Sequence, residues 1–253
     1  MSRFIDKLNK VSQAAPQPMG FRATQPVSSK LKMQLVASIA EANVDSLADY
    51  VAGADAGLLH ISKLTSGAKA LQKISKAVPD IAWGGWLKES DERVIKQMVN
   101  AGSDFVVFPA STPLTILQNG EVGKILEVES SLSEGLMRTV NELPVDAVLI
   151  AAGPVEYLTW HHLMFFQRFA ALLTKPLLVI IPSNVTASEL QVLWETGVDG
   201  VVIEVGIELP EDRLKELRQA IDELDFPARR QKKAEALLPH ITSGRDVVTE
   251  EEE

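Results

Sequence analysis

Short hydrophobic segments alternate with longer segments of helical periodicity between residues 31 and 225. The short segments are rich in Val, Ile and Leu, and we expect strands at residues 33–39, 57–61, 81–83, 105–108, 124–129, 147–151, 177–181 and 200–205. Helical patterns occupy residues 44–52, 67–78, 90–101, 113–118, 133–142, 158–174, 187–196 and 210–224. Eight strand-and-helix units of about 25 residues each predict an α/β fold, a single (β/α)8 TIM barrel.

The two ends of the chain lack this alternation. Residues 1–30 form an N-terminal extension with one helical pattern at residues 4–11, which we expect to close the bottom of the barrel. The barrel itself is expected to span residues 31–225. In the charged tail, residues 226–253, the high charge and the lack of aromatic residues beyond Phe226 favour a mobile segment, although AEALLPHI within it leaves a subunit contact open.

The composition excludes several classes of protein. A formal net charge of -9 argues against a nucleic-acid partner, and the absence of cysteine excludes disulfides and thiolate chemistry. The N-terminus lacks the apolar core of a secretory signal. Residues 163–182 are apolar, but Arg168 and Lys175 interrupt them, so we expect a helix followed by a strand and no membrane partner. These observations predict a cytoplasmic protein.

Polar residues fall on the interior side of three predicted strands. In residues 124–130, KILEVES, the residues Leu126 and Val128 form the helix-facing set, so Glu127 and Glu129 belong to the interior set. The same alternation turns His60 and Glu204 inward. Barrel enzymes place their active sites at the carboxyl ends of the strands, where these residues lie.

Buried carboxylates require a compensating charge, because an unpaired charge is costly away from water. A hard divalent ion such as Mg²⁺ would meet this need through oxygen ligands. The ordinary alternative is that the glutamates pair with rim lysines such as Lys63, Lys88 or Lys124. His60 could likewise be a core or rim histidine that binds no ligand. A shift of one residue in strand register would also turn every glutamate outward, toward the helices.

Residues 124–157 contain Glu129 at the end of an apolar strand, a Val-Asp-Ala strand start, and Gly-Pro-Val-Glu-Tyr ending at Tyr157. In these features the segment resembles the HpcH/HpaI aldolase and citrate lyase β-subunit family. The resemblance implies a lyase in which Glu129 and Glu156 bind Mg²⁺ or Mn²⁺, a 2-oxo acid chelates the ion, and the metal stabilises an enolate. The family's arginine at a strand end is absent here, and Lys88 or Lys63 would replace it.

Two further segments suggest ligand contacts. Trp83 and Trp86 flank two glycines, and they would form a lid or a stacking wall for a planar ligand such as a flavin, or simply cover the core. Ser183 and Asn184 follow the seventh strand, where barrels often bind phosphate. Ser183 and Thr186 also suit plain helix capping, and Glu204 and nearby acidic residues would repel a phosphate.

The helical pattern at residues 158–174 is apolar on more than one face, which favours a homo-oligomer through this sixth helix. The residues concerned are Trp160, Leu163, Met164 and Phe166. The sequence thus predicts a small-molecule enzyme, a metal-dependent lyase with Lys88, His60 and Glu127 as catalytic residues. The alternatives are a non-catalytic binding or assembly barrel, or a phosphate- or flavin-binding barrel.

Overall fold

The computed structural model describes residues 2–12, 32–40, 51–61, 64–88, 92–118, 122–151, 156–206, 209–210 and 212–224, with backbone alone at 64–65, 92–95 and 117–118. Within them eight parallel strands pair in chain order, and the last pairs with the first. They are β1 (Gln34–Ala40), β2 (Ala56–Ile61), β3 (Ala82–Leu87), β4 (Phe105–Pro109), β5 (Gly123–Glu129), β6 (Ala147–Ala151), β7 (Leu177–Ile181) and β8 (Gly200–Val205). This closed ring confirms the predicted (β/α)8 barrel.

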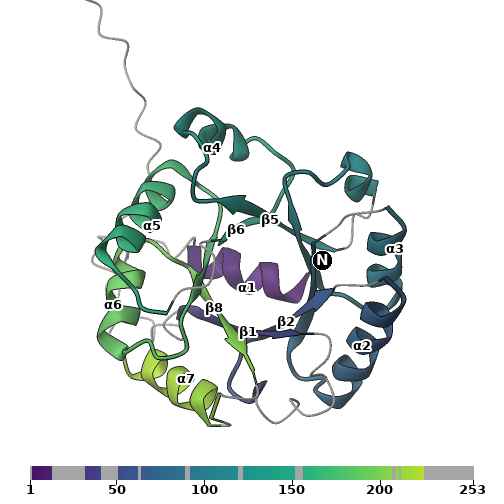
Figure 1. Cartoon of the computed structure of the whole chain (residues 1–253), viewed down its shortest axis with the longest axis horizontal. Helices are drawn as coiled ribbons and strands as arrows, with labels where there is room; N and C mark the ends of the chain where they lie inside the picture. Colours follow the sequence, from purple (N-terminus) through teal and green to yellow (C-terminus); the bar gives the residue numbers. More distant parts are fainter. Residues whose placement is uncertain are drawn as a thin grey trace, which may run out of the picture.

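Helices surround the ring of strands (Figure 1). They are α2 (Leu64–Ala77), α3 (Glu92–Asn100), α4 (Glu134–Val140), α5 (Trp160–Leu172), α6 (Ala187–Glu195) and α7 (Arg213–Glu223). Between β4 and β5 the predicted helix is a short 3-10 helix, η3 (Leu114–Gln118), because five residues are too few for a stable α-helix. Two predicted segments lie outside the described residues: the helix at residues 44–52, of which only 51–52 are described, and the tail.

Strand β3 continues through its two glycines, whereas the sequence predicted an end at residue 83. A Cβ atom at Gly84 would come within 2.3 Å of the Phe105 ring, so the glycine makes room for an aromatic ring inside the barrel. Gly84 therefore serves close packing between β3 and β4, within a continuous strand.

The N-terminal helix α1 (Arg3–Ser12) lies across the centre of the ring in Figure 1. Its residues Phe4, Ile5 and Leu8 are buried and join the apolar interior of the barrel. The ring centroids of Phe4 and Phe105 are 4.7 Å apart. Since Phe105 begins β4, α1 closes the amino-terminal end of the barrel, as expected from the sequence.

An aspartate precedes each even-numbered strand, and three of the four bind the preceding strand. Their carboxylates accept the backbone N–H of the first or second residue of that strand, which pins the strand ends in register. The pairs are Asp55 with Leu35 at 2.8 Å, Asp146 with Lys124 at 2.7 Å and Asp199 with Leu177 at 2.8 Å. Asp104 instead accepts the backbone N–H groups of Arg3 and Phe4, at 2.8 and 3.0 Å. This change of partner fixes the start of α1.

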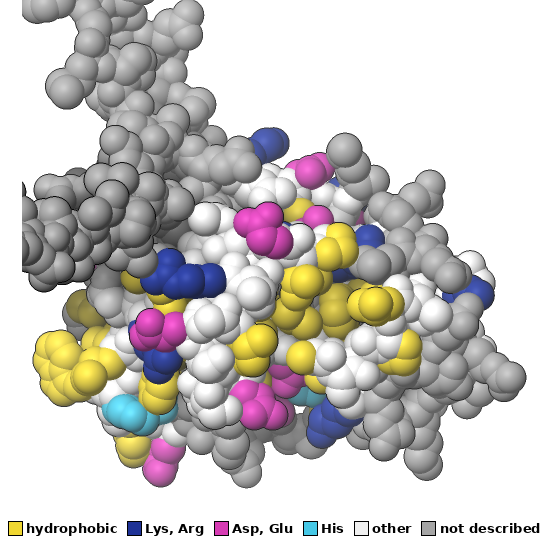
Figure 2. Space-filling view, turned by 90° about the horizontal axis from the view of Figure 1, so that it is seen from above, with side chains coloured by type: hydrophobic (Ala, Val, Ile, Leu, Met, Phe, Trp, Pro, Cys, Tyr) yellow, Lys and Arg dark blue, Asp and Glu magenta, His cyan; other side chains and the backbone are white. Residues whose placement is uncertain are grey.

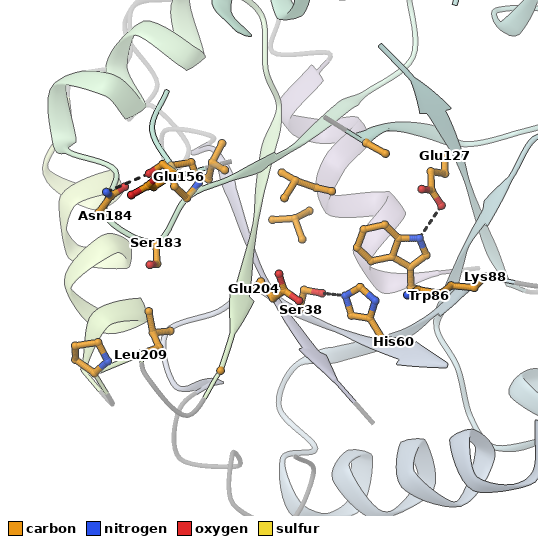
Figure 3. A pocket seen from close by; sticks show the side chains of 17 residues that line it. Ser38, His60, Trp86, Lys88, Glu127, Glu156, Ser183, Asn184, Glu204 and Leu209 are labelled. Atoms are coloured by element: carbon orange, nitrogen blue, oxygen red, sulfur yellow. Dashed lines mark hydrogen bonds between the residues drawn. The ribbon is translucent and has the colours of Figure 1, made fainter. Parts of the chain in front are cut away.

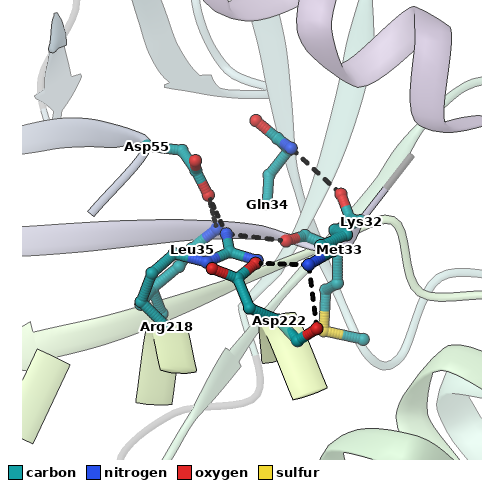
Figure 4. A network of polar contacts seen from close by, with 7 residues as sticks. All are labelled: Lys32, Met33, Gln34, Leu35, Asp55, Arg218 and Asp222. Atoms are coloured by element: carbon teal, nitrogen blue, oxygen red, sulfur yellow. Dashed lines mark hydrogen bonds and ion pairs between the residues drawn. The ribbon is translucent and has the colours of Figure 1, made fainter. Parts of the chain in front are cut away.

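Arg218 of α7 ties the helix to the amino-terminal ends of β1 and β2 (Figure 4). Its guanidinium donates to Asp55 at 2.6 Å and to Asp222 at 2.9 Å. Burial alone would raise the pKa of Asp222, but hydrogen bonds from Lys32 and Arg218, together with their positive charge, lower this pKa below its ordinary 3.8. The network therefore favours the ionised Asp222 in the folded protein.

Replacing Arg218 with methionine is expected to lower the free energy of unfolding by about 1 to 3 kcal/mol, because the partly buried Asp55 loses its partner. Because the pKa of Asp222 is lower in the folded protein than in the unfolded chain, its ionised carboxylate stabilises the fold at pH values above the unfolded pKa near 3.8. This stabilisation is lost as the pH falls through the folded pKa. Urea unfolding between pH 2 and pH 6 should show a weaker acid dependence in the variant. Arg138→Met, on an exposed position of α4, should change neither quantity.

Candidate active site

The barrel interior changes from apolar to polar toward the carboxyl ends of the strands. Its lower positions are apolar, for example Val36, Leu58 and Val202. The next inward positions on three of these strands are Ser38, His60 and Glu204. They line a cavity of about 790 Å³ together with Trp86, Lys88, Glu127, Ala151, Glu156, Ile180, Ile181, Pro182, Ser183, Asn184, Gly206, Leu209 and Pro210. This is the end of the barrel at which TIM-barrel active sites lie.

His60 is held on two sides (Figure 3). Its Nε2 atom lies 2.8 Å from the Ser38 hydroxyl oxygen, and its ring lies 4.4 Å from the Trp86 ring, centroid to centroid. Ser38 is 1% exposed, and its hydroxyl positions the imidazole at the wall of the cavity. The imidazole is partly exposed and therefore accessible from the cavity.

Burial lowers the pKa of His60 below its ordinary value of 6.5. The Glu204 carboxylate opposes this effect and raises the pKa, whereas the Lys88 ammonium group adds to it and lowers the pKa. The net result is a neutral imidazole at neutral pH. A neutral, positioned imidazole can accept a proton from a bound molecule.

Trp86 also positions a carboxylate. Its indole N–H donates to a carboxylate oxygen of Glu127 at 2.7 Å, a bond that joins β3 to β5 across the cavity wall. Glu127 is half-buried and lines the cavity, as the alternation along its strand predicts. One tryptophan thus supports both His60, by ring contact, and Glu127, by a hydrogen bond.

The predicted metal pair does not gather around the cavity. Glu129 is the last residue of β5, is exposed, and accepts a hydrogen bond from Ser131 at 3.1 Å, whereas Glu156 lines the cavity. The Glu129 side chain, at the end of β5, is exposed to solvent. The part of the chain that the structure describes contains no group of three His, Asp or Glu residues able to hold a metal ion. Glu156 alone of the predicted pair lines the cavity, and binding of Mg²⁺ or Mn²⁺ by the two residues stays a prediction.

The loop after β7 combines helix capping with cavity lining. Thr186 is the N-cap of α6 and forms a capping box with Glu189, which confirms the capping interpretation for Thr186. Ser183 and Asn184 line the cavity, and the Asn184 side-chain amide donates to the backbone oxygen of Glu156 at 3.3 Å. Asn184 therefore joins the loop after β7 to Glu156 at the cavity rim.

Trp83 lies outside the site. It is 2% exposed, belongs to the apolar layer between strands and helices, and donates its indole N–H to the backbone oxygen of Val78 at 2.9 Å. Because residues 83 and 86 point to opposite faces of β3, only Trp86 reaches the cavity. The predicted contact of Trp83 with a substrate is wrong.

Helix α5 exposes two large apolar side chains. Trp160 is 83% exposed and Met164 is 70% exposed, whereas Phe166, also predicted to lie in a subunit interface, is 1% exposed and belongs to the core. Figure 2 shows hydrophobic side chains beside a histidine at the edge where Figure 1 places α5 and α6. Association through α5 stays a prediction.

None of the described helices is long and apolar enough to cross a bilayer.

Two features of the site were not predicted from the sequence. Ser38 was missed, although the pattern Leu35, Ala37 and Ile39 on the helix-facing side of β1 marks it as inward. Leu209 and Pro210 also line the cavity, and no local pattern in the sequence indicates this position.

Comparisons with known proteins support the fold alone. No family model and no curated protein sequence matches the chain. Among solved structures, a mutant tryptophan synthase alpha-subunit from Pyrococcus furiosus matches with a TM-score of 0.58 and 10% identity, over 76% of this chain and 98% of that one. Thiamine phosphate pyrophosphorylase from Pyrococcus furiosus matches with a TM-score of 0.56 and 16% identity, over 76% and 96% of the two chains. A designed cube-shaped protein cage matches with a TM-score of 0.56 and 15% identity, over 75% and 71%.

Proposed function

We propose that the protein is a small-molecule enzyme that transfers a proton next to a carbonyl group, with His60 as the general base and acid. The observation that carries this proposal is the Ser38–His60 contact at 2.8 Å at the wall of the cavity. Together with Trp86 it fixes a neutral imidazole where a substrate can reach it. An imidazole in this state can remove a proton from a carbon next to a carbonyl and return it to the product.

Lys88 supplies the second requirement of this reaction. Its ammonium group lines the cavity and lies near enough to His60 to lower the pKa of the imidazole. When a proton leaves the carbon, negative charge develops on the carbonyl oxygen, and an ammonium group placed there stabilises the enolate. His60 and Lys88 would therefore act on neighbouring atoms of one substrate.

Glu127 extends the proposal to carbon–carbon cleavage. Its carboxylate is fixed by Trp86 and can accept a hydrogen bond from a substrate hydroxyl. In an aldol cleavage His60 or Glu127 would take up the hydroxyl proton, and the carbon that carries the hydroxyl would become a new carbonyl. The electron pair of the broken carbon–carbon bond would form an enolate with the original carbonyl, and the same proton would return to the enolate carbon. Binding of Mg²⁺ or Mn²⁺, which the resemblance implies, stays an untested prediction, and no step here depends on it.

Proton exchange in deuterated water tests the proposal. The protein is incubated with a panel of 2-oxo acids, ketones and aldehydes, and loss of the signal from protons next to the carbonyl is followed by proton NMR. We expect exchange above the buffer rate for at least one compound, and at least a tenfold loss in Lys88→Met. Exchange at the buffer rate for every compound would contradict the proposal.

A further inference from the structure

The Ser38–His60 contact leaves two positions for the proton of the neutral imidazole. The Ser38 hydroxyl oxygen lies 2.8 Å from Nε2, and it either donates its proton to this nitrogen or accepts the Nε2 proton. In the first arrangement Nδ1 carries the ring proton and has no lone pair to act as a base, whereas in the second its lone pair is free. The tautomer of His60 therefore decides whether this residue can take a proton from a substrate.

Two charged groups flank His60 on opposite sides. The strands follow one another around the barrel in the order β8, β1, β2 and β3. Glu204 of β8 is paired in register with Ser38 of β1. His60 of β2 is paired with Trp86 of β3, and Lys88 follows two residues later. Figure 3 shows Glu204 and Ser38 on the Nε2 side of the imidazole and Lys88 on the other side.

Both charges act on the imidazole. The Glu204 carboxylate raises the pKa of His60 and the Lys88 ammonium group lowers it. Because Ser38 is 1% exposed, neighbouring protein groups set the direction of its hydroxyl. The Glu204 carboxylate attracts the hydroxyl proton of Ser38, which turns an oxygen lone pair to Nε2, and the Lys88 ammonium group attracts the lone pair of Nδ1. The two charges thus favour the same tautomer, with the proton on Nε2.

We propose that Glu204 is a positioning residue that acts through Ser38 to hold the proton of neutral His60 on Nε2, so that Nδ1 is the atom that takes the substrate proton. This inference rests on the proposed function, because that function makes His60 the base. Nδ1 and the Lys88 ammonium group then lie on the same side of the ring. The atom that takes the proton and the group that stabilises the enolate therefore face the same part of the cavity.

The proton moves in a closed cycle. Nδ1 takes a proton from the substrate carbon, the electron pair of the broken carbon–hydrogen bond forms the enolate, and the imidazole becomes an imidazolium whose Nε2 proton stays bonded to Ser38. Return of the Nδ1 proton to the carbon restores the neutral ring. Neither Ser38 nor Glu204 changes its protonation state, and the Glu204 charge stabilises the imidazolium while it exists.

Nitrogen-15 NMR of the labelled full chain reads the tautomer directly, because a protonated ring nitrogen and an unprotonated one have well separated chemical shifts. Spectra are recorded at about pH 8, where His60 is neutral because burial lowers its pKa below 6.5. The chain has four histidines, and comparison with His60→Gln identifies the signals of His60. We expect a protonated Nε2 and an unprotonated Nδ1.

Glu204→Met removes both the charge and the oxygens that attract the Ser38 proton. We expect the tautomer protonated at Nδ1 to increase, and kcat for proton exchange to fall by about 10- to 100-fold with little change in KM, as for the loss of a hydrogen bond to a charged group. Glu204→Gln keeps an oxygen acceptor without the charge, so both changes should be smaller. Glu156→Gln is the matched control, because it changes a second cavity carboxylate that Figure 3 shows away from Ser38, and the tautomer should stay the same.

Thermal unfolding of each variant verifies that it is folded. A proton on Nδ1 in the wild-type protein, or the same tautomer in the wild type and both Glu204 variants, would overturn the inference. Either result with proton exchange intact would leave the proposed function standing. The expected tautomer and its change in Glu204→Met, without exchange of any compound, would contradict the proposed function and leave Glu204 as the residue that sets the tautomer.

Discussion

Replacing His60 with glutamine is expected to slow proton exchange by about 100- to 10,000-fold, the range found when a general acid–base group is removed. Glutamine can still bond to the Ser38 hydroxyl and contact Trp86, so the wall of the cavity should remain in place. It has no group that takes up or releases a proton at neutral pH. The loss should appear in kcat, with only a small change in KM.

His161→Gln is the matched control for this substitution. His161 lies on an exposed position of α5 and its ring contacts Phe165, so its replacement changes a histidine without touching the cavity. Exchange in this variant should equal that of the wild type. An exchange rate in His60→Gln within about threefold of the wild type would remove His60 from the mechanism, because general acid–base catalysis contributes far more than that.

The pH dependence of the exchange rate gives a second readout of His60. The neutral imidazole is the base, so the rate should rise with pH through the pKa of His60, which burial places below 6.5, and level off above it. Glu204→Gln removes the charge that raises this pKa, so the rising limb should move to lower pH. Lys88→Met removes a charge that lowers it, so the limb should move to higher pH. A purely structural role for His60 would leave the limb in place.

The direction of the cavity side chains was predictable from the sequence. Alternation along a strand is local, so the neighbours of Glu127, His60 and Glu204 decide which way each side chain points. The same reasoning assigned Glu129 to the interior, but the structure exposes it, because the alternation of side chains does not show at which residue a strand ends. The predicted strand at residues 81–83 ended too early because glycine is uncommon inside strands, whereas here Gly84 accommodates the Phe105 ring within β3.

The contacts that make the site were not predictable, because they depend on register between strands. Residue 60 of β2 pairs with residue 40 of β1, so Ser38 reaches His60 diagonally and not from the opposite position. The Trp86–Glu127 bond joins β3 to β5 across the intervening β4. Such a contact requires the curvature of a closed barrel, and no pattern within either strand specifies it.

Replacing Phe4 with alanine is expected to lower the free energy of unfolding by about 3 to 5 kcal/mol, as for other large aromatic residues removed from a core. Phe4 is 0% exposed and its ring contacts Phe105 at the amino-terminal end of the barrel. Truncation would leave a cavity between α1 and β4, because the helix start is held by Asp104 and cannot move inward freely. The loss would therefore include both the buried ring and the space it leaves.

Urea unfolding followed by circular dichroism measures this effect, with Lys7→Ala as the control on the exposed face of the same helix. Lys7→Ala should change the free energy of unfolding by less than about 0.5 kcal/mol, the range of ordinary surface substitutions. Leu8→Ala, which removes a second fully buried side chain of α1, should cost about 2 to 5 kcal/mol. If Phe4→Ala and Leu8→Ala were as stable as Lys7→Ala, α1 would not be part of the cooperative core. The cavity at the other end of the barrel would then rest on the strands and outer helices alone.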